Sequence, residues 1–372
     1  MNGQWIGKHG GTNSGSIIVN CDDRGDYYEG VAYIGDSIYS LPSLAAVFKT
    51  NNRDNDFKFR TQVIMPINRL TGGVDSWENC KKLYADDTIL PKYADVKGCW
   101  DSESLTLEWT TDIGTGGFSK LPKTNADKPS EYNPINTDWI GFKEFVSTLE
   151  GRRLLFRGQN KPWRLRTAFH RTERANLARF VTEDISALYK NLSARTKHLF
   201  NLSVPDENGA FYNLLQHHGY PTPLLDWTCS PYVAAFFAYR SIDKNKASLA
   251  RDDEKVRILV FDYKQWAADL NQILSLNTAA LHLSTCEFIA IENERMIPQQ
   301  SVSTITNIDD IESYIQLIEK EKGKSYLKVI DLPVTERTKV MRELSFMGIT
   351  AGSLFPGLDG ACEELKERFF NL

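Results

Sequence analysis

The chain has 372 residues, which is more than one domain usually holds, so two domains are the starting expectation. Apolar residues make up 41% of the sequence and charged residues 25%, the composition of a folded globular protein, which excludes a mostly disordered chain. A formal net charge of −4 excludes both a generally basic nucleic-acid coat protein and an acidic tail protein.

The cysteines and the apolar runs predict the compartment. The six cysteines are scattered without a Cys-x-x-Cys pair, so neither a zinc site nor a dense disulfide framework is indicated. Residues 1–9 lack the apolar core of a signal peptide, and the longest apolar run, residues 232–239, is far too short to cross a bilayer. We therefore expect a soluble, cytoplasmic protein with no membrane contact and no metal.

Residues 1–135 are predicted to form an all-β domain. Short runs at residues 16–21, 28–34, 57–66 and 104–110 are separated by Gly, Asn, Asp, Ser and Thr, and polar and apolar side chains alternate in several of them, as in a half-buried strand. We expect five to eight antiparallel strands in a sandwich or a small barrel. This part holds 14 Lys and Arg against 18 Asp and Glu, so it carries the whole net charge.

Residues 136–372 are predicted to form an α+β domain. The proline-containing stretch 120–137 is expected to be the linker. Beyond it, apolar residues on one helical face predict helices at 138–149 and 173–198. Further helices are expected at 232–240, which is apolar on all sides and opened by Ser230-Pro231, at 309–322 and 334–346, with another ending near His217 and one at the C-terminus. Strands are expected at residues 154–157, 256–261, 288–291, 301–306 and 326–330.

The charge is strongly uneven within the second part. Residues 152–200 contain 12 Lys and Arg against three acids, a net charge of +9. Such a density favours a ligand that bears phosphate, either a nucleotide or a nucleic-acid backbone. A basic helix face that simply contacts water is the alternative reading of the same pattern.

Two short motifs could carry chemistry. In Phe156-Arg157-Gly158-Gln159, an arginine at the end of a buried strand could direct its guanidinium at a phosphate or ribose that approaches the bare glycine backbone. The alternative is a structural arginine that bridges buried carbonyls. No Gly-x-Gly-x-x-Gly, Walker loop, His-Glu-x-x-His or Gly-x-Ser-x-Gly pattern occurs in the sequence.

The second motif lies at residues 216–228. His217 is a candidate proton carrier at neutral pH, and Asp226 could orient it or a ligand hydroxyl. The alternative is that Asp226 and Thr228 bond backbone amides before the next helix, for which Ser230 is the predicted N-cap.

These motifs resemble the FRG domain family, which takes its name from the Phe-Arg-Gly triplet. The resemblance includes the block from His218 to Thr228, the helix that follows Ser230-Pro231 and the segment 354–359, and it extends from about residue 139 to the C-terminus. The family is chiefly bacterial and phage-associated, and its resemblance alone implies no particular activity. It does not cover residues 1–135.

The order of the motifs also resembles that of ADP-ribosyltransferases. There an arginine on an early strand precedes a strand ending in Ser or Thr, and a Glu or Gln follows late in the chain. The resemblance implies that Arg157 grips the phosphate or ribose of NAD, that Thr228 and Ser230 shape the nicotinamide pocket, and that Glu294 or Gln300 stabilises the oxocarbenium-like state. By this reading Phe156, Gly158 and Gln159 also border the cofactor.

Several details of this resemblance stay open at the level of sequence. Glu287, Glu292 and Gln299 compete with Glu294 and Gln300 for the late position. Pro223 stands where an arginine is common in the FRG pattern, and Ser301 stands where a glycine often follows the glutamine pair.

The leading prediction is an NAD-dependent ADP-ribosyltransferase-like or NAD-cleaving effector that acts in toxin or antiphage defence on a protein or nucleic-acid acceptor. The alternative is a non-catalytic module that binds a nucleotide or a nucleic acid. In either case, the antiparallel edges of residues 1–135 could dock a protein partner.

Overall fold

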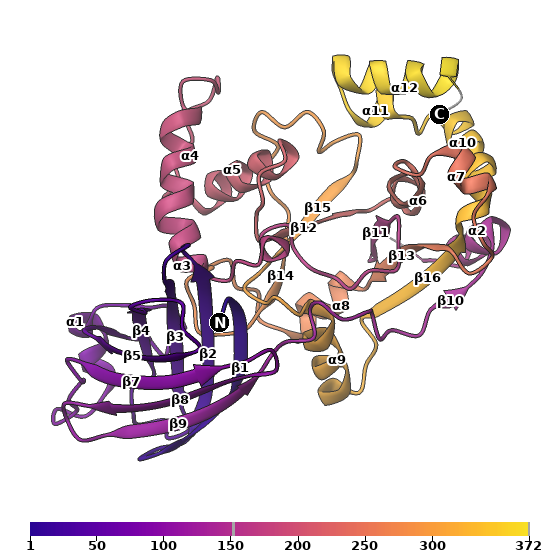
Figure 1. The fold of residues 1–372 in the computed structure, drawn as a ribbon. Coiled ribbons are helices and arrows are strands. Elements are labelled where there is room, and N and C mark those ends of the chain that lie inside the picture. The colour runs from indigo at the N-terminus through magenta and orange to yellow at the C-terminus, as the bar shows by residue number, and fades with distance from the viewer. Residues whose placement is uncertain (151–152, 371–372) are drawn as a thin grey trace.

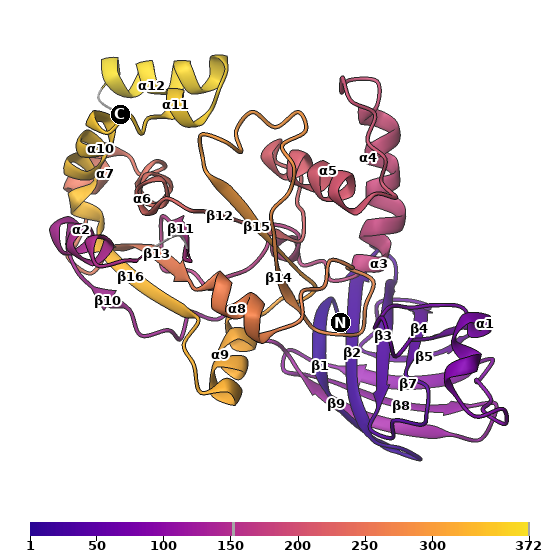
Figure 2. The same cartoon turned by 180° about the vertical axis from the view of Figure 1, so that it is seen from behind.

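The computed structural model of the protein describes residues 1–150 and 153–370, and it contains two β-sheets of different architecture (Figure 1; Figure 2 shows the reverse side). The first sheet is antiparallel and curls into a nearly closed barrel. The second is mixed and carries helices on both faces. The predicted α+β class with an all-β N-terminal part is confirmed.

The barrel is closed by one bent stretch of chain. Strands β5 (Asp56–Thr61) and β6 (Val63–Pro66) form opposite edges of the sheet, yet only Gln62 separates them, so they join the two edges. The sheet order is β5-β7-β8-β9-β1-β2-β3-β4-β6, and the barrel rather than the sandwich is formed. The other strands are β1 (Gly3–Gly11), β2 (Gly15–Asp23), β3 (Tyr28–Asp36), β4 (Leu44–Lys49), β7 (Ala94–Trp100), β8 (Ser104–Thr111) and β9 (Gly116–Pro122), with α1 (Trp77–Cys80) and the short turn η1 (Lys81–Leu83) between β6 and β7.

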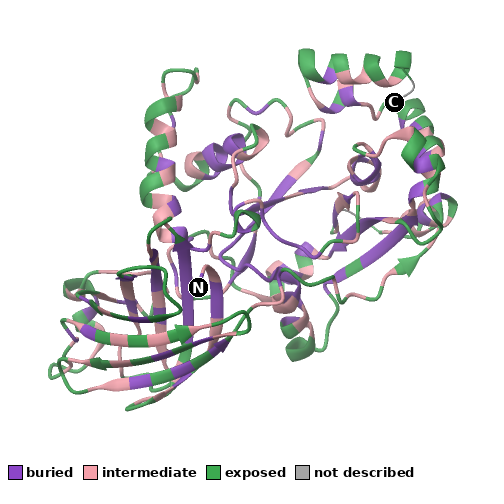
Figure 3. Ribbon diagram, viewed as in Figure 1, coloured by how far each residue is buried: buried purple, intermediate pink, exposed green. Residues whose placement is uncertain are grey.

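Alternating side chains explain why these residues form a barrel. Along β8, Leu105 and Leu107 are buried while Thr106 and Glu108 are exposed, and Figure 3 shows the same alternation along β7 and β9. A period of two places one set of side chains inside the barrel and the other outside.

The second sheet has the order β10-β16-β13-β11-β12-β15-β14. Its neighbours are antiparallel except β10 and β16, which are parallel. The strands are β10 (Ile135–Asn136), β11 (Leu155–Gln159), β12 (Leu224–Thr228), β13 (Lys255–Phe261), β14 (Leu283–Cys286), β15 (Ser301–Thr306) and β16 (Leu327–Pro333). β10 lies within the segment predicted as the linker, so that segment already contributes to the second sheet.

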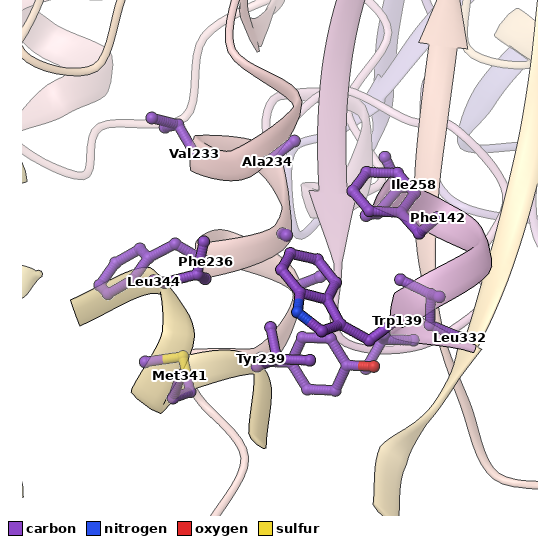
Figure 4. Close-up of a cluster of buried hydrophobic side chains, with 14 of the residues drawn as sticks. Trp139, Phe142, Val233, Ala234, Phe236, Tyr239, Ile258, Leu332, Met341 and Leu344 are labelled. Atoms are coloured by element: carbon purple, nitrogen blue, oxygen red, sulfur yellow. The ribbon is translucent and has the colours of Figure 1, made fainter. Parts of the chain in front are cut away.

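Helices cover both faces of this sheet. Helices α2, α6 and α10 pack on one face around Trp139, Phe236 and Tyr239 (Figure 4), whereas α8 and α9 pack on the other around Trp266 and Ile315. The helices are α2 (Trp139–Ser147), α3 (Leu177–Arg179), α4 (Ile185–Leu192), α5 (Pro205–His217), α6 (Pro231–Tyr239), α7 (Lys244–Ser248), α8 (Tyr263–Asp269), α9 (Ile311–Lys322), α10 (Arg337–Phe346), α11 (Ala351–Leu354) and α12 (Leu358–Phe370), with the short 3₁₀-helices η2 (His170–Thr172) and η4 (Val334–Glu336) and the π-helix η3 (Phe180–Asp184). Among the described residues, no helix is long and apolar enough to cross a membrane.

Two predicted elements differ in the structure. The helix expected at 173–198 is interrupted: Glu173 adopts a left-handed φ of 63°, Asn176 caps a new start, and residues 180–184 form a π-helix before α4. Residues 288–291 form no strand, because the partner of β15 is β14 instead. Phe288 packs its ring close to Gly209 of α5.

The outer wall of the barrel packs against the second part of the chain. Ile18, Val31 and Tyr33 from β2 and β3 form an apolar cluster with Ala178 and Leu281. Beside this cluster, the buried Asp22 accepts hydrogen bonds from the backbone N–H groups of residues 175 and 176, at 2.8 and 2.9 Å, and pairs with the arginines at 174 and 179. The two parts of the chain therefore share a packed, charge-paired interface.

Candidate functional site

The Phe-Arg-Gly motif lies on β11, where the pairing between neighbouring strands is incomplete on one side. β11 pairs with β13 along its whole length, but with β12 only through Phe156 and Thr228. The Arg157 guanidinium reaches across this junction and donates from Nη1 to the carbonyl oxygen of Asp226, 2.6 Å away. The second motif is thereby fixed to the first through a backbone oxygen.

The Arg157 guanidinium is strongly desolvated. Burial lowers its pKa to about 10, an effect that the nearby carboxylate of Asp226 opposes and the positive charge of Arg171 reinforces. The group is still a cation at neutral pH. Its Nε is buried and has no hydrogen-bond partner among the described residues, so the cation keeps one donor for a further acceptor.

Gln159 adds a second polar group on the same face of β11, since residues two apart on a strand point to the same side. Both amide atoms of its buried side chain lack a partner within residues 1–150 and 153–370. Arg257, which lies opposite Gln159 in the register, has an Nη1 in the same state. Buried polar atoms of this kind are nearly always satisfied by protein, ligand or ordered water.

Phe156 and Gly158 point to the other face and serve packing. Phe156 is buried in the core against α6. A Cβ placed on Gly158 would lie 1.9 Å from the carbonyl oxygen of Ala234 and 2.7 Å from the amide nitrogen of Ala238. The glycine therefore allows α6 to approach the strand, and the space beside it holds a helix backbone.

Thr228 and Ser230 hold the start of α6. The Thr228 hydroxyl donates to the carbonyl oxygen of Gln299, 2.7 Å away, and accepts from the backbone N–H of Ser230 at 3.0 Å. The Ser230 hydroxyl caps the helix by accepting from the N–H of Val233 at 3.3 Å. The predicted N-cap is formed, and both hydroxyls have structural partners.

His217 belongs to a hydrogen-bond network that ends beside Asp226, and among the described residues no hydrogen bond joins His217 to Asp226. His217 Nδ1 is 2.8 Å from Oδ1 of Asn293, and Asn293 in turn donates to Asn213. Asn213 donates to Oγ of Ser303 at 3.0 Å, and Ser303 lies opposite Asp226 in the register of β12 and β15. The partner that orients His217 is thus Asn293. Asp226 keeps a buried Oδ1 that has no partner within the described chain.

The late Glu and Gln candidates occupy one loop. Gln300 is exposed, has a left-handed φ of 48°, and its carbonyl oxygen accepts from the backbone N–H of residue 229 at 3.0 Å, so it lies beside the end of β12. Glu294 is exposed between Asn293 and Arg295, both of which contact His217. The competing Gln299 is buried and donates to the carbonyl oxygen of Leu354.

Much of the basic segment is engaged in ion pairs. Arg164 pairs with Asp310, Arg166 with Asp309, and Arg174 with both Asp22 and an acid at 184. The acids at 22, 309 and 310 come from distant parts of the chain, so the local count of +9 could not reveal them, whereas the acid at 184 is one of the three in that count. Arg152, which belongs to the same count, lies outside the described residues.

Sequence reasoning missed Asn213, Asn293 and Arg171. No local sequence pattern marks the two asparagines, because Asn213 lies on α5 and Asn293 lies in the loop after β14, and only the fold brings them together. No group of three or more His, Cys, Asp or Glu that could hold a metal occurs among the residues that the structure describes.

The comparisons with known proteins give the class of this region. Residues 152–247 match the family model of the FRG domain, and the match contains Phe156-Arg157-Gly158, His217 and Asp226. Residues 152–247 are therefore similar to an FRG domain, and β11, β12 and α6 lie within them. No curated protein and no solved structure matches the chain.

Proposed function

We propose that the FRG part of the chain binds NAD and breaks the bond between nicotinamide and ribose, passing the ADP-ribosyl group to an acceptor or to water. The observation that carries this proposal is the buried Arg157 guanidinium, with its open Nε and the unpartnered amide of Gln159 on the same strand face. A desolvated cation with a free donor suits a diphosphate or a ribose oxygen.

The residues around Arg157 have complementary roles in this proposal. Arg157 holds the diphosphate or ribose, and Gln300 or Glu294 binds the ribose hydroxyl and stabilises the positive charge that develops as nicotinamide leaves with the bonding electron pair. His217, oriented by Asn293, takes the proton that the attacking acceptor or water loses. A toxin or antiphage effector in the cytoplasm is the biological role that we propose for such a reaction.

A non-catalytic nucleotide-binding module would use the same arginine. Nucleic-acid binding draws less support, because Arg164, Arg166 and Arg174 already pair with carboxylates. Binding of NAD without cleavage would favour the non-catalytic module.

The test uses the full chain with NAD labelled separately in nicotinamide and in adenine, with and without protein and RNA acceptors. We expect wild type to release nicotinamide, and Arg157→Gln to lower the rate about 100-fold, because one preorganised charged contact is worth about that much in a transition state. Arg157→Lys keeps the positive charge and loses the planar, multiple-donor geometry of the guanidinium. Its rate of nicotinamide release should lie between those of wild type and Arg157→Gln.

Arg153→Gln is the matched control, because Arg153 is an exposed arginine close to the start of β11 that pairs with Asp262. It should keep the wild-type rate. No nicotinamide release by wild type with any acceptor class would refute the reaction, and an equal rate in Arg157→Gln would refute the role of Arg157.

A further inference from the structure

The barrel contains a cavity that the proposed reaction does not use. Its volume is about 510 Å³, within the usual range of small-molecule sites, and a barrel of about eight strands is wide enough to hold one small ligand. The lining is mostly apolar and comes from strands around the whole barrel: Ile17, Val19, Ala32, Ile34, Phe48 and Phe59 on one side and Val96, Leu107 and Trp109 on the other.

Small side chains leave this space open. Ala32 of β3 and Ala46 of β4 lie opposite each other in the register and both line the cavity. Phe59 and Trp109 also line it and keep part of their surface accessible to solvent, although they belong to the inward-facing set of the barrel. Elsewhere in the barrel, fully buried side chains such as Leu105 fill the interior. The core is therefore packed in one region and hollow in another.

The loops at the ends of β1, β3 and β8 frame the open end. Leu41, Ile89 and Ile113 from these and neighbouring loops line the cavity, and Ile89 and Ile113 are 68% and 41% exposed. Tyr39, at 76% exposure, lies in the same loop as Leu41. Exposed apolar side chains gathered at the rim of an apolar cavity are typical of a ligand entrance.

His9 and Asp36 are two polar residues of the cavity lining that can accept a hydrogen bond. His9 lines the cavity, and its Nε2 donates to the carbonyl oxygen of Gly35 at 2.9 Å, which leaves Nδ1 of the neutral ring as an acceptor. Asp36 also lines the cavity, and its Oδ1 accepts from the backbone N–H of Ile38 at 2.8 Å, which leaves Oδ2 for a ligand. The hydroxyl of Thr111 donates to the carbonyl oxygen of Thr115 at 3.0 Å and is thereby engaged.

We propose that the barrel binds a small, uncharged, mainly apolar molecule with an aromatic ring system and a hydrogen-bond donor at its outer end. The stacked rings of Phe48 and Phe59, 5.5 Å apart, and the edge of His9 against Trp109 present aromatic surface to such a ring system. The donor would meet His9 or Asp36 at the entrance. This site is separate from Arg157, so the proposal does not rest on the reaction with NAD.

The test measures binding of N-phenyl-1-naphthylamine, a neutral aromatic probe with one N–H donor that fluoresces in apolar surroundings. The full chain is titrated with the probe, and saturable, blue-shifted emission is expected. Ala46→Phe and Ala32→Phe each place a ring in the cavity, and each should weaken binding at least about tenfold because the space is lost. Circular dichroism verifies that each variant is folded.

Thr110→Phe is the matched control, because it adds the same ring at an exposed position of β8. Its affinity should stay within about twofold of wild type, as expected for a surface substitution away from the site. The proposal is overturned by wild type without saturable emission, or by a folded Ala46→Phe or Ala32→Phe variant that binds as wild type does.

Discussion

Gly158 shows how a motif residue can serve packing. The sequence motif suggested that the bare backbone receives a ligand, whereas the structure places the backbone of α6 against it, through the Ala234 carbonyl and the Ala238 amide. The glycine thus sets the distance between β11 and α6. Arg157, its neighbour, points to the opposite face and is held by the carbonyl oxygen of Asp226.

Gly158→Ala should destabilise the protein. The added Cβ would meet backbone atoms, which cannot rotate away, so strand and helix must separate. We expect a loss of about 2–3 kcal/mol in the free energy of unfolding, measured by urea titration followed by circular dichroism. Gly73→Ala is the control, because its Cβ would lie at ordinary contact distances of 3.6 Å or more. Equal stability of the two variants would contradict this account of Gly158.

At the scale of elements, Asp22 connects β2 with the segment that starts α3. Its two oxygens accept from two backbone N–H groups and pair with the guanidinium groups of Arg174 and Arg179. The carboxylate is fully buried, and so are its two hydrogen bonds to backbone N–H groups, whereas both arginines keep part of their surface exposed.

Asp22→Ala should therefore cost about 2–4 kcal/mol in the free energy of unfolding, because it leaves two buried backbone N–H donors without an acceptor, whereas Arg174 and Arg179 keep their pairs with Asp184 and Glu183. The neighbouring Asp23→Ala removes a carboxylate that pairs with the exposed Arg53, and it should cost about 1 kcal/mol or less. Urea titrations of both variants make the comparison. A small effect of Asp22→Ala would show that the contact between β2 and α3 is not held by this carboxylate.

The elements also show what could be read from the sequence. The barrel strands were predictable because the alternation of polar and apolar side chains is a local signal. Ser230 was predictable as an N-cap because a cap and the N–H group that it accepts from lie only three positions apart in the sequence. The closure of the barrel by β5 and β6 was not, since it depends on which edges meet. The interruption of the helix at 173–198 arises from Glu173 and the π-helix, which the apolar spacing does not reveal.

The candidate site was predictable in part for the same reason. Arg157 and Asp226 lie in compact motifs, and the structure joins them through a backbone oxygen. The pairing of His217 with Asn293 spans 76 residues of sequence and follows from no local pattern. Likewise, the charge of residues 152–200 is balanced by acids such as Asp22 and Asp310 that only the fold brings near.

At the scale of the whole molecule, stability should depend on pH through two buried histidines. Burial lowers the pKa of His282 to about 4 and that of His170 to about 3. The folded chain keeps both rings neutral, whereas the unfolded chain binds protons below a pH of about 6.5. The contribution of these two rings to the free energy of unfolding is therefore fully present above a pH of about 6.5. It falls as the pH decreases toward their pKa values in the folded chain.

By pH 5 each histidine should have removed about 2 kcal/mol from the free energy of unfolding. Urea titrations at pH 7.5, 6 and 5 measure the loss. His282→Gln should make the difference in the free energy of unfolding between pH 7.5 and pH 5 smaller by about 2 kcal/mol, whatever its effect at pH 7.5. A free energy of unfolding that does not change between pH 7.5 and 5 would contradict the assignment of both rings as neutral.

Strands β2 and β3 line the cavity with their inner face and pack against the second part of the chain with their outer face. Ile17, Val19 and Ala32 face the cavity, while Ile18 and Val31 pack against the second part of the chain. If filling the cavity displaces β2 or β3, the same displacement moves the residues that pack at the interface. If filling the cavity changes the affinity of the second part of the chain for a ligand, thermodynamic reciprocity requires that this ligand change the affinity of the barrel by the same factor.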